Sequence, residues 1–152
     1  MSPPHAPSET PVAVVVDASA IVEIALDSDT PRRRAVLEVL HGDPVWVIPD
    51  YTDIEVVSAV GRVVGRAVNR RTSRGGLSTG QARRVLGLVS AMPFTRVPVR
   101  GVADRVLELM SNHSAYDAGY IAIAERIDAP VLTLDRGMAS SAVARCRFVH
   151  LT

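Results

Sequence analysis

Short runs of apolar, mostly β-branched residues alternate along the chain with longer segments in which apolar residues recur every three or four positions. An unbroken apolar run is typical of a strand buried on both faces, and the longer period is typical of an amphipathic helix. The runs predict strands at residues 12–16, 45–48, 94–97, 130–133 and 147–151. The periodic segments predict helices at residues 18–26, 31–41, 52–69, 79–92, 102–111, 115–127 and 136–144. Strands that alternate with helices in this way predict an α/β fold with a parallel sheet covered on both faces.

Local signals mark where several of these helices begin. Thr30 followed by Pro31 is a typical helix start, with threonine as the cap and proline at the first helical position. Ser78 and Gln81 have the spacing of a capping box, and Ser114 precedes the helix expected from residue 115. In the helix at 52–69, the apolar spacing predicts a buried face that includes Ile54, Val57 and Val60.

Length and composition favour one globular domain. The chain has 152 residues, of which 47% are hydrophobic, enough for a substantial core. Residues 1–11 are rich in proline and polar groups, which predicts a disordered lead-in before a single domain at residues 12–152. No segment resembles a signal peptide or approaches the roughly 20 apolar residues needed to span a bilayer. Cys146, the only cysteine, excludes an internal disulfide and a cysteine zinc cluster, and it fits a cytoplasmic location.

Basic residues are unevenly distributed although the formal net charge is only +1. All 17 are arginines, and residues 61–84 contain seven of them and no acid. Such a block can bind phosphate groups or an acidic partner, and it can equally be the solvated face of a helix. The arginines of this block that are candidates for such a contact are Arg62, Arg66, Arg70, Arg71 and Arg74.

Aspartates stand at the ends of two predicted strands. Asp17 follows the first strand and Asp135 the fourth, while Asp117 opens a predicted helix. Each one singly could cap a helix or favour its dipole. However, the carboxyl ends of parallel strands meet at one sheet edge, where the repulsion between two carboxylates requires a cation or a proton. Oxygen ligands without histidine or cysteine favour Mg²⁺ or Mn²⁺, which can position water for phosphodiester hydrolysis.

Three segments resemble, in order and spacing, successive motifs of PIN-domain ribonucleases, and most closely the VapC toxins of bacterial VapBC toxin–antitoxin pairs. They read VVVDASAIVEIAL, PDYTDIEVVSAV and SAYDAGYIAIAERIDAPVLTLDRGMA. The resemblance implies a three-layer α/β/α sandwich with a central, mostly parallel sheet of four to five strands. It implies a catalytic set of Asp17, Glu55, Asp117 and Asp135. The three aspartates of that set would be the metal ligands, and two hydroxyl residues, Ser19 and Thr133, would orient the carboxylates.

The same resemblance implies an Mg²⁺-dependent endoribonuclease, with Mn²⁺ as a substitute. It would be the toxin of a type II pair that cleaves tRNA, rRNA or mRNA and thereby inhibits translation and growth. A VapB-type antitoxin is then the expected partner, together with a homodimer and a heterotetramer or larger complex, and no membrane. The arginine block would contact the RNA backbone or the antitoxin, and the sequence does not choose between these uses.

This chain lacks residues that other classes of nucleotide-binding and phosphoryl-transfer proteins require. A receiver domain and a haloacid-dehalogenase-type phosphatase both need a lysine, which this chain does not contain, and no P-loop motif occurs. Asp53 lies two residues before Glu55 and so faces another side of its helix, outside the acidic set. His113 precedes Asp117 by four residues and is either near the site or a surface or capping residue. The remaining alternative is a catalytically inactive PIN-fold module that binds RNA or protein.

Overall fold

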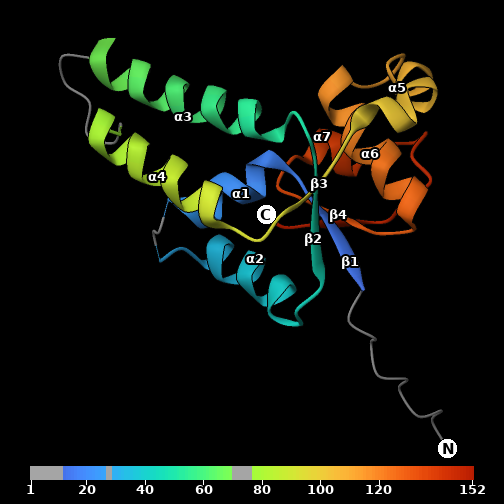
Figure 1. Cartoon of the computed structure of the whole chain (residues 1–152), viewed down its shortest axis with the longest axis horizontal. Coiled ribbons are helices and arrows are strands. Elements are labelled where there is room, and N and C mark those ends of the chain that lie inside the picture. Colours follow the sequence, from blue (N-terminus) through green and yellow to red (C-terminus); the bar gives the residue numbers. More distant parts are fainter. Residues whose placement is uncertain (1–11, 27–28, 70–76) are drawn as a thin grey trace, which may run out of the picture.

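The computed structural model describes residues 12–26, 29–69 and 77–152, without the side chains of residues 63–69 (Figure 1). Within these ranges five parallel strands form one sheet, in the order β3-β2-β1-β4-β5. The strands are β1 (Ala13–Val16), β2 (Val45–Pro49), β3 (Thr95–Val97), β4 (Val131–Thr133) and β5 (Phe148–His150). The expected α/β fold with a parallel sheet is thus confirmed. The predicted lead-in at residues 1–11 lies outside the described residues.

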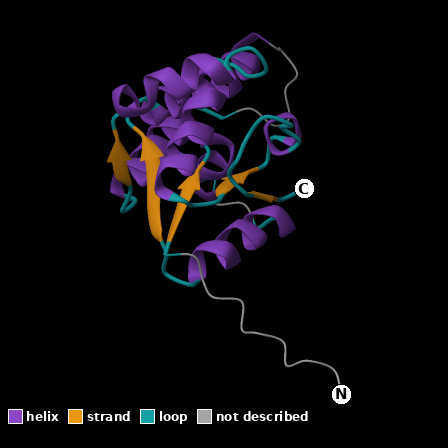
Figure 2. Cartoon of the chain, turned by 90° about the vertical axis from the view of Figure 1, so that its right-hand side faces the viewer, coloured by secondary structure: helices purple, strands orange, loops and turns teal. Residues whose placement is uncertain are grey.

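Helices cover both faces of the sheet, as Figures 1 and 2 show. One layer contains α1 (Ala18–Ala25), α2 (Pro31–His41), α3 (Thr52–Asn69) and α4 (Thr79–Ala91). The opposite layer contains the 3₁₀ turn η1 (Val99–Val102), α5 (Ala103–Leu109), α6 (Ala115–Ile127) and α7 (Arg136–Ala139). The sheet therefore lies between two layers of helices, and the expected three-layer α/β/α sandwich is confirmed. In the described ranges, no helix has both the length and the apolar character needed to cross a membrane.

The central strand β1 is buried on both faces. Val14 and Val16 belong to the core beneath the first helical layer, whereas Val15 belongs to the core beneath the second. Successive side chains of a strand point to opposite faces, so a continuous valine run supplies both cores at once. This is the physical reason why the unbroken apolar run marks an interior strand.

The helix starts predicted from local chemistry are confirmed. The Thr30 hydroxyl accepts a hydrogen bond from the Arg33 amide at 3.0 Å, and both bonds of the Ser78 and Gln81 capping box are present. The Ser114 hydroxyl accepts from the Asp117 amide at 3.1 Å. Each cap satisfies amide groups that the first turn of a helix leaves without a partner.

Two details of the prediction are wrong. Along α3 the buried side is formed by Thr52, Val56 and Val60, while Ile54 is 60% exposed and Val57 is 44% exposed. The apolar spacing therefore located the helix but placed two of its residues on the wrong face. In addition, α7 ends at Ala139 instead of near residue 144, because the following residues bond elsewhere as described below.

The chain after α7 is held by polar side chains instead of by a continued helix. The Ser141 hydroxyl accepts from the Ala144 amide at 3.1 Å. The Glu125 carboxylate accepts from the Arg145 amide at 2.8 Å. Since these amides are satisfied by side chains, the segment has no need of the helical bonding pattern.

Candidate active site

The four acids singled out in the sequence line a single pocket of about 320 Å³. They come from four separate segments: the end of β1, the first turn of α3, the first turn of α6, and the connection between β4 and α7. In that order they are Asp17, Glu55, Asp117 and Asp135. The pocket also contains Ser19 and Arg62. The fold thus gathers the predicted acidic set at the carboxyl edge of the sheet.

Asp17 is the most buried of these acids, with only 6% of its surface exposed. Its carboxylate oxygen Oδ2 accepts hydrogen bonds from the Ser19 hydroxyl and, at 2.8 Å, from the Thr133 hydroxyl. Although Asp17 precedes α1, its side chain makes no capping hydrogen bond to that helix. Burial raises the pKa of the Asp17 carboxyl, the two hydroxyls lower it, and the negative charge of Asp117 raises it again.

The two hydroxyl groups also tie the site to the segment that follows β4. The Thr133 oxygen accepts from the Asp135 amide at 2.9 Å, and the Ser19 oxygen accepts from the Leu134 amide at 3.1 Å. A hydroxyl has one proton to donate, so an oxygen that accepts from an amide here directs its proton toward Asp17. Ser19 and Thr133 therefore fix the orientation of the Asp17 carboxylate.

Glu55 is held by a residue that the sequence analysis did not identify. The hydroxyl of Tyr120, which is fully buried, donates to Glu55 Oε2 at 2.6 Å and lies 2.9 Å from the Thr52 hydroxyl. Burial and the nearby carboxylates raise the pKa of Tyr120, which keeps the phenol protonated and able to donate. Burial likewise raises the pKa of Glu55, whereas the bond from Tyr120 lowers it. The signal for Tyr120 was a polar group within an otherwise buried helix, because such a group needs a partner.

The remaining two acids are less enclosed. Asp135 Oδ1 accepts from the Met138 amide at 3.0 Å, so this side chain caps α7 as well as lining the pocket. Asp117 lies in the first turn of α6, where its own amide bonds to Ser114 and its side chain borders the pocket. The capping alternative that the sequence left open is thus the observed bonding for Asp135 but not for Asp17.

Asp53 and His113, also discussed from the sequence, do not line this pocket. Asp53 forms a two-bond ion pair with Arg96, at 2.7 and 2.9 Å. His113 lies 2.7 Å from the Ser141 hydroxyl. Of the arginine candidates, Arg62 lines the pocket, and Arg66 lies in α3 where side chains are not described. Arg70, Arg71 and Arg74 lie outside the described residues.

The donor chemistry of the pocket suits a hard divalent cation. Its ionisable lining consists of four carboxylates and one guanidinium, with no histidine or cysteine. In the described part of the chain, no three His, Cys, Asp or Glu side chains converge closely enough to enclose an ion. Mg²⁺ is usually bound through one or two carboxylates and retains several waters, so an open acidic pocket fits this ion better than a closed cage would.

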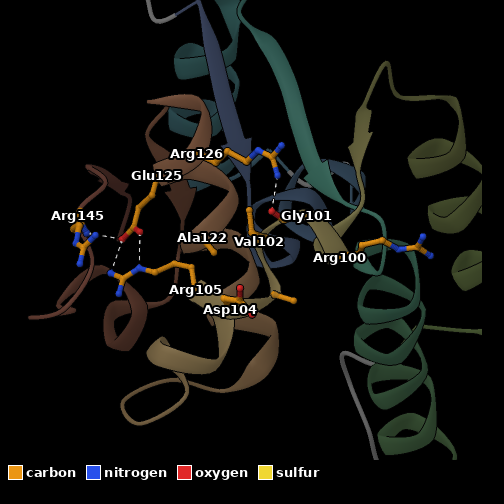
Figure 3. Close-up of a pocket in the computed structure, with 10 residues that line it drawn as sticks. Arg100, Gly101, Val102, Asp104, Arg105, Ala122, Glu125, Arg126 and Arg145 are labelled. Carbon is orange, nitrogen blue, oxygen red and sulfur yellow. Dashed lines mark hydrogen bonds and ion pairs between the residues drawn. The ribbon is translucent and has the colours of Figure 1, made fainter.

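A larger cavity, of about 500 Å³, lies among η1, α5 and α6 (Figure 3). Two of its charged residues, Arg105 and Glu125, form an ion pair with each other. Arg105 contacts Glu125 at 2.8 Å and Glu108 at 2.9 Å, and Arg126 donates to the Gly101 carbonyl at 2.5 Å. Since the cavity gathers none of the four acids, its size does not make it the candidate site.

Known proteins share both the sequence pattern and the fold. The sequence model of the PIN domain matches residues 14–143. The chain is 32% identical over 133 residues to Ribonuclease VapC9 of Mycobacterium tuberculosis, covering 88% of this chain and 94% of that protein.

Among solved structures, VapBC2 from Rickettsia felis, bound to a DNA fragment from its promoter, aligns with a TM-score of 0.61 at 11% identity. The alignment covers 92% of this chain and 99% of that chain. A toxin–antitoxin complex from Klebsiella pneumoniae aligns with a TM-score of 0.59 at 15% identity, covering 90% of this chain and 95% of that chain. At these identities the two structures support the fold alone.

Proposed function

Because this chain belongs to the PIN-domain family, and within it to the VapC ribonucleases, we propose that it is a metal-dependent endoribonuclease that serves as the toxin of a type II toxin–antitoxin pair. The observation that carries the proposal is the single pocket lined by Asp17, Glu55, Asp117 and Asp135. Hydrolysis of a phosphodiester needs a positioned water and a means to offset developing negative charge, and a carboxylate-bound divalent ion supplies both.

The proposed ligands are the three aspartates, which would hold the ion partly through water, with Mg²⁺ as the expected ion and Mn²⁺ as a substitute. Ser19 and Thr133 hold the Asp17 carboxylate in one orientation, which supports its role as a ligand. Glu55, fixed by the Tyr120 hydroxyl, would orient the attacking water. Arg62 lines the same pocket and would offer a positive charge to the phosphate of the substrate.

The partners follow from the family. The substrate class is RNA, with tRNA, rRNA and mRNA all consistent with cleavage that inhibits translation and growth. A VapB-type antitoxin would neutralise the chain, because the chain belongs to the VapC ribonucleases. A homodimer that assembles with antitoxin into a heterotetramer or larger complex is the expected form. The arginine block around Arg62 would contact the RNA or the antitoxin.

Cleavage of RNA by the purified chain tests the proposal. The wild type is expected to cut RNA in Mg²⁺ or Mn²⁺, and EDTA is expected to stop the reaction. Asp117→Asn should abolish cleavage, because it removes a proposed ligand. Asp53→Asn is the matched control, since it makes the same chemical change on an acid that pairs with Arg96 outside the pocket. Failure of the wild type to cut any RNA would favour the catalytically inactive binding module instead. Full activity of Asp117→Asn would refute the assignment of the site.

A further inference from the structure

A second pocket, of about 290 Å³, adjoins the acidic one. It is lined by Ile54, Glu55, Ser58, Arg62 and Tyr116. Glu55 and Arg62 line both pockets, so the two cavities share a wall. A group bound in the second pocket would therefore lie directly beside the four acids.

The second pocket exposes apolar surface that the fold does not bury. The Tyr116 side chain is 50% exposed and the Ile54 side chain is 60% exposed. The same pocket contains the Ser58 hydroxyl and the Arg62 guanidinium, which donates a hydrogen bond to that hydroxyl at 2.8 Å. An aromatic ring beside an arginine, next to a site for phosphodiester chemistry, is the combination that binds single-stranded nucleic acid.

Neighbouring residues hold Tyr116 in place before any ligand binds. The rings of Tyr51 and Tyr116 meet edge to face, with centroids 5.3 Å apart and planes at 66°. The Tyr51 hydroxyl also donates to the Tyr116 carbonyl at 2.5 Å. Tyr51 can pass this close to α6 because residue 119 is glycine, where a Cβ atom would collide with the Tyr51 hydroxyl. Such pre-organisation lowers the entropic cost of binding.

We propose that this pocket is a nucleobase subsite. It binds one unpaired base of an RNA strand, stacked on Tyr116 and packed against Ile54, while Arg62 contacts the phosphate that leads into the acidic pocket. The inference rests on the proposed ribonuclease function, to which it adds the position of a substrate nucleotide. A base fits better than an apolar protein side chain, because Arg62 lines both pockets and offers its positive charge to the backbone of a strand that passes from one to the other.

Binding is best measured in the Asp17→Asn background, in which cleavage is expected to be absent. The probes are short single-stranded RNAs that carry the fluorescent base 2-aminopurine at successive positions. Stacking on tyrosine should quench the fluorophore at one position. Tyr116→Ala should abolish this quenching and weaken binding about tenfold, within the range known for loss of one stacked base. Tyr116→Phe keeps the ring and should restore both.

Two further variants separate stacking from folding. Tyr116→Leu retains apolar contact with Tyr51 but has no ring, so it should fold and still lose the quenching. Leu107→Ala, on the exposed side of α5, is the control for removal of an exposed apolar residue elsewhere. In the cleavage-competent chain, Tyr116→Leu should raise KM by about the same factor and change kcat far less.

The outcomes separate this proposal from the function on which it rests. If the wild type cleaves RNA but Tyr116→Leu binds and cleaves normally, the subsite is refuted and the ribonuclease stands. If Tyr116→Leu impairs only the binding of an antitoxin, the pocket is a protein contact and the proposal is also refuted. If the wild type cuts no RNA yet binding and quenching depend on Tyr116, the subsite stands and catalysis is refuted.

Discussion

Replacing Asp17 by asparagine is expected to stabilise the metal-free protein while it removes ribonuclease activity. The wild-type carboxylate is buried and, in the described part of the chain, forms no ion pair with a basic side chain. The hydroxyls of Ser19 and Thr133 donate to the same oxygen, Oδ2. An asparagine carbonyl can take that position, accept from the same hydroxyls and present its neutral amide to the acids of the pocket. The fold thus loses a charge and keeps both hydroxyl bonds.

The expected gain in the free energy of unfolding is about 1 kcal/mol. Burying a carboxylate costs about 5 kcal/mol, and each hydroxyl bond to it returns about 2 kcal/mol. Burying an amide costs about 2 kcal/mol, and each hydroxyl bond to it returns about 1 kcal/mol. The difference favours asparagine even before the repulsion from Asp117 is relieved. For a chain of 152 residues, a change of about 1 kcal/mol moves Tm by about 2–4 °C.

Thermal unfolding in EDTA at neutral pH measures this difference directly. Burial raises the pKa of Asp17 above the ordinary carboxyl value of 3.8. Ionisation of Asp17 therefore lowers the free energy of unfolding of the wild type, and this loss is complete once the pH has risen through the folded-state pKa. As the pH falls toward 3.8, the wild type regains this stability, and the difference in Tm between Asp17→Asn and the wild type should shrink. Adding Mg²⁺ should stabilise the wild type more than the variant, because ligand binding to the native state raises its stability.

Two controls accompany the measurement. Asp17→Ala leaves the two hydroxyls without their acceptor and should be less stable than the wild type. Asp53→Asn loses only an exposed ion pair with Arg96 and should cost at most about 1 kcal/mol. An Asp17→Asn variant that unfolds below the wild type in EDTA at neutral pH would refute the account of Asp17 as a destabilising charge.

Three further predictions concern residues around the site. Tyr120→Phe removes the donor that holds Glu55, the proposed catalytic glutamate, and should lower kcat about tenfold or more while KM changes little, as steady-state cleavage assays would show. Gly119→Ala places a methyl group against the Tyr51 hydroxyl and 2.9 Å from ring carbon Cζ, and should cost about 1–3 kcal/mol in a denaturant titration. Glu125→Gln breaks the partly buried pair with Arg105 and should lower stability by about 2 kcal/mol, yet leave cleavage unchanged below its Tm because the pair lies outside the acidic pocket.

The elements of the fold could be predicted because their signals are local. Thr30, Ser78 and Ser114 each bond to an amide three residues away, so the start of each helix is determined within one turn of sequence. The exposure of Ile54 and Val57 could not be predicted in this way. Which side of α3 is buried depends on how the helix sits against the first core, and several registers of one apolar spacing are compatible with the same sequence.

The residues of the candidate site also differ in whether sequence signals could identify them. Strand-end chemistry pointed to Asp17 and Asp135, and family resemblance was needed to include Glu55 firmly. Tyr120 was missed because its partner lies 65 residues away in the sequence, and only the fold brings the two residues together at the edge of the sheet. Tyr116 carried no sequence signal, since its exposure depends on the position of Tyr51 across the start of α6.

The strand order explains why these acids meet at this place. From β1 the chain passes through β2 to β3 at one edge of the sheet, and the helices of this part lie in the first layer. It then returns to β4 on the other side of β1, and the helices that follow β3 lie in the second layer. The order therefore reverses between β1 and β4, and this is the point at which parallel sheets open a crevice. Asp17 follows β1 and Asp135 follows β4, while α3 and α6 reach the crevice from opposite layers with Glu55 and Asp117. Because the crevice lies at the middle of the sheet, the acid that ends the central strand is also the one most deeply buried, and it is the one that needs two hydroxyl donors to remain in place.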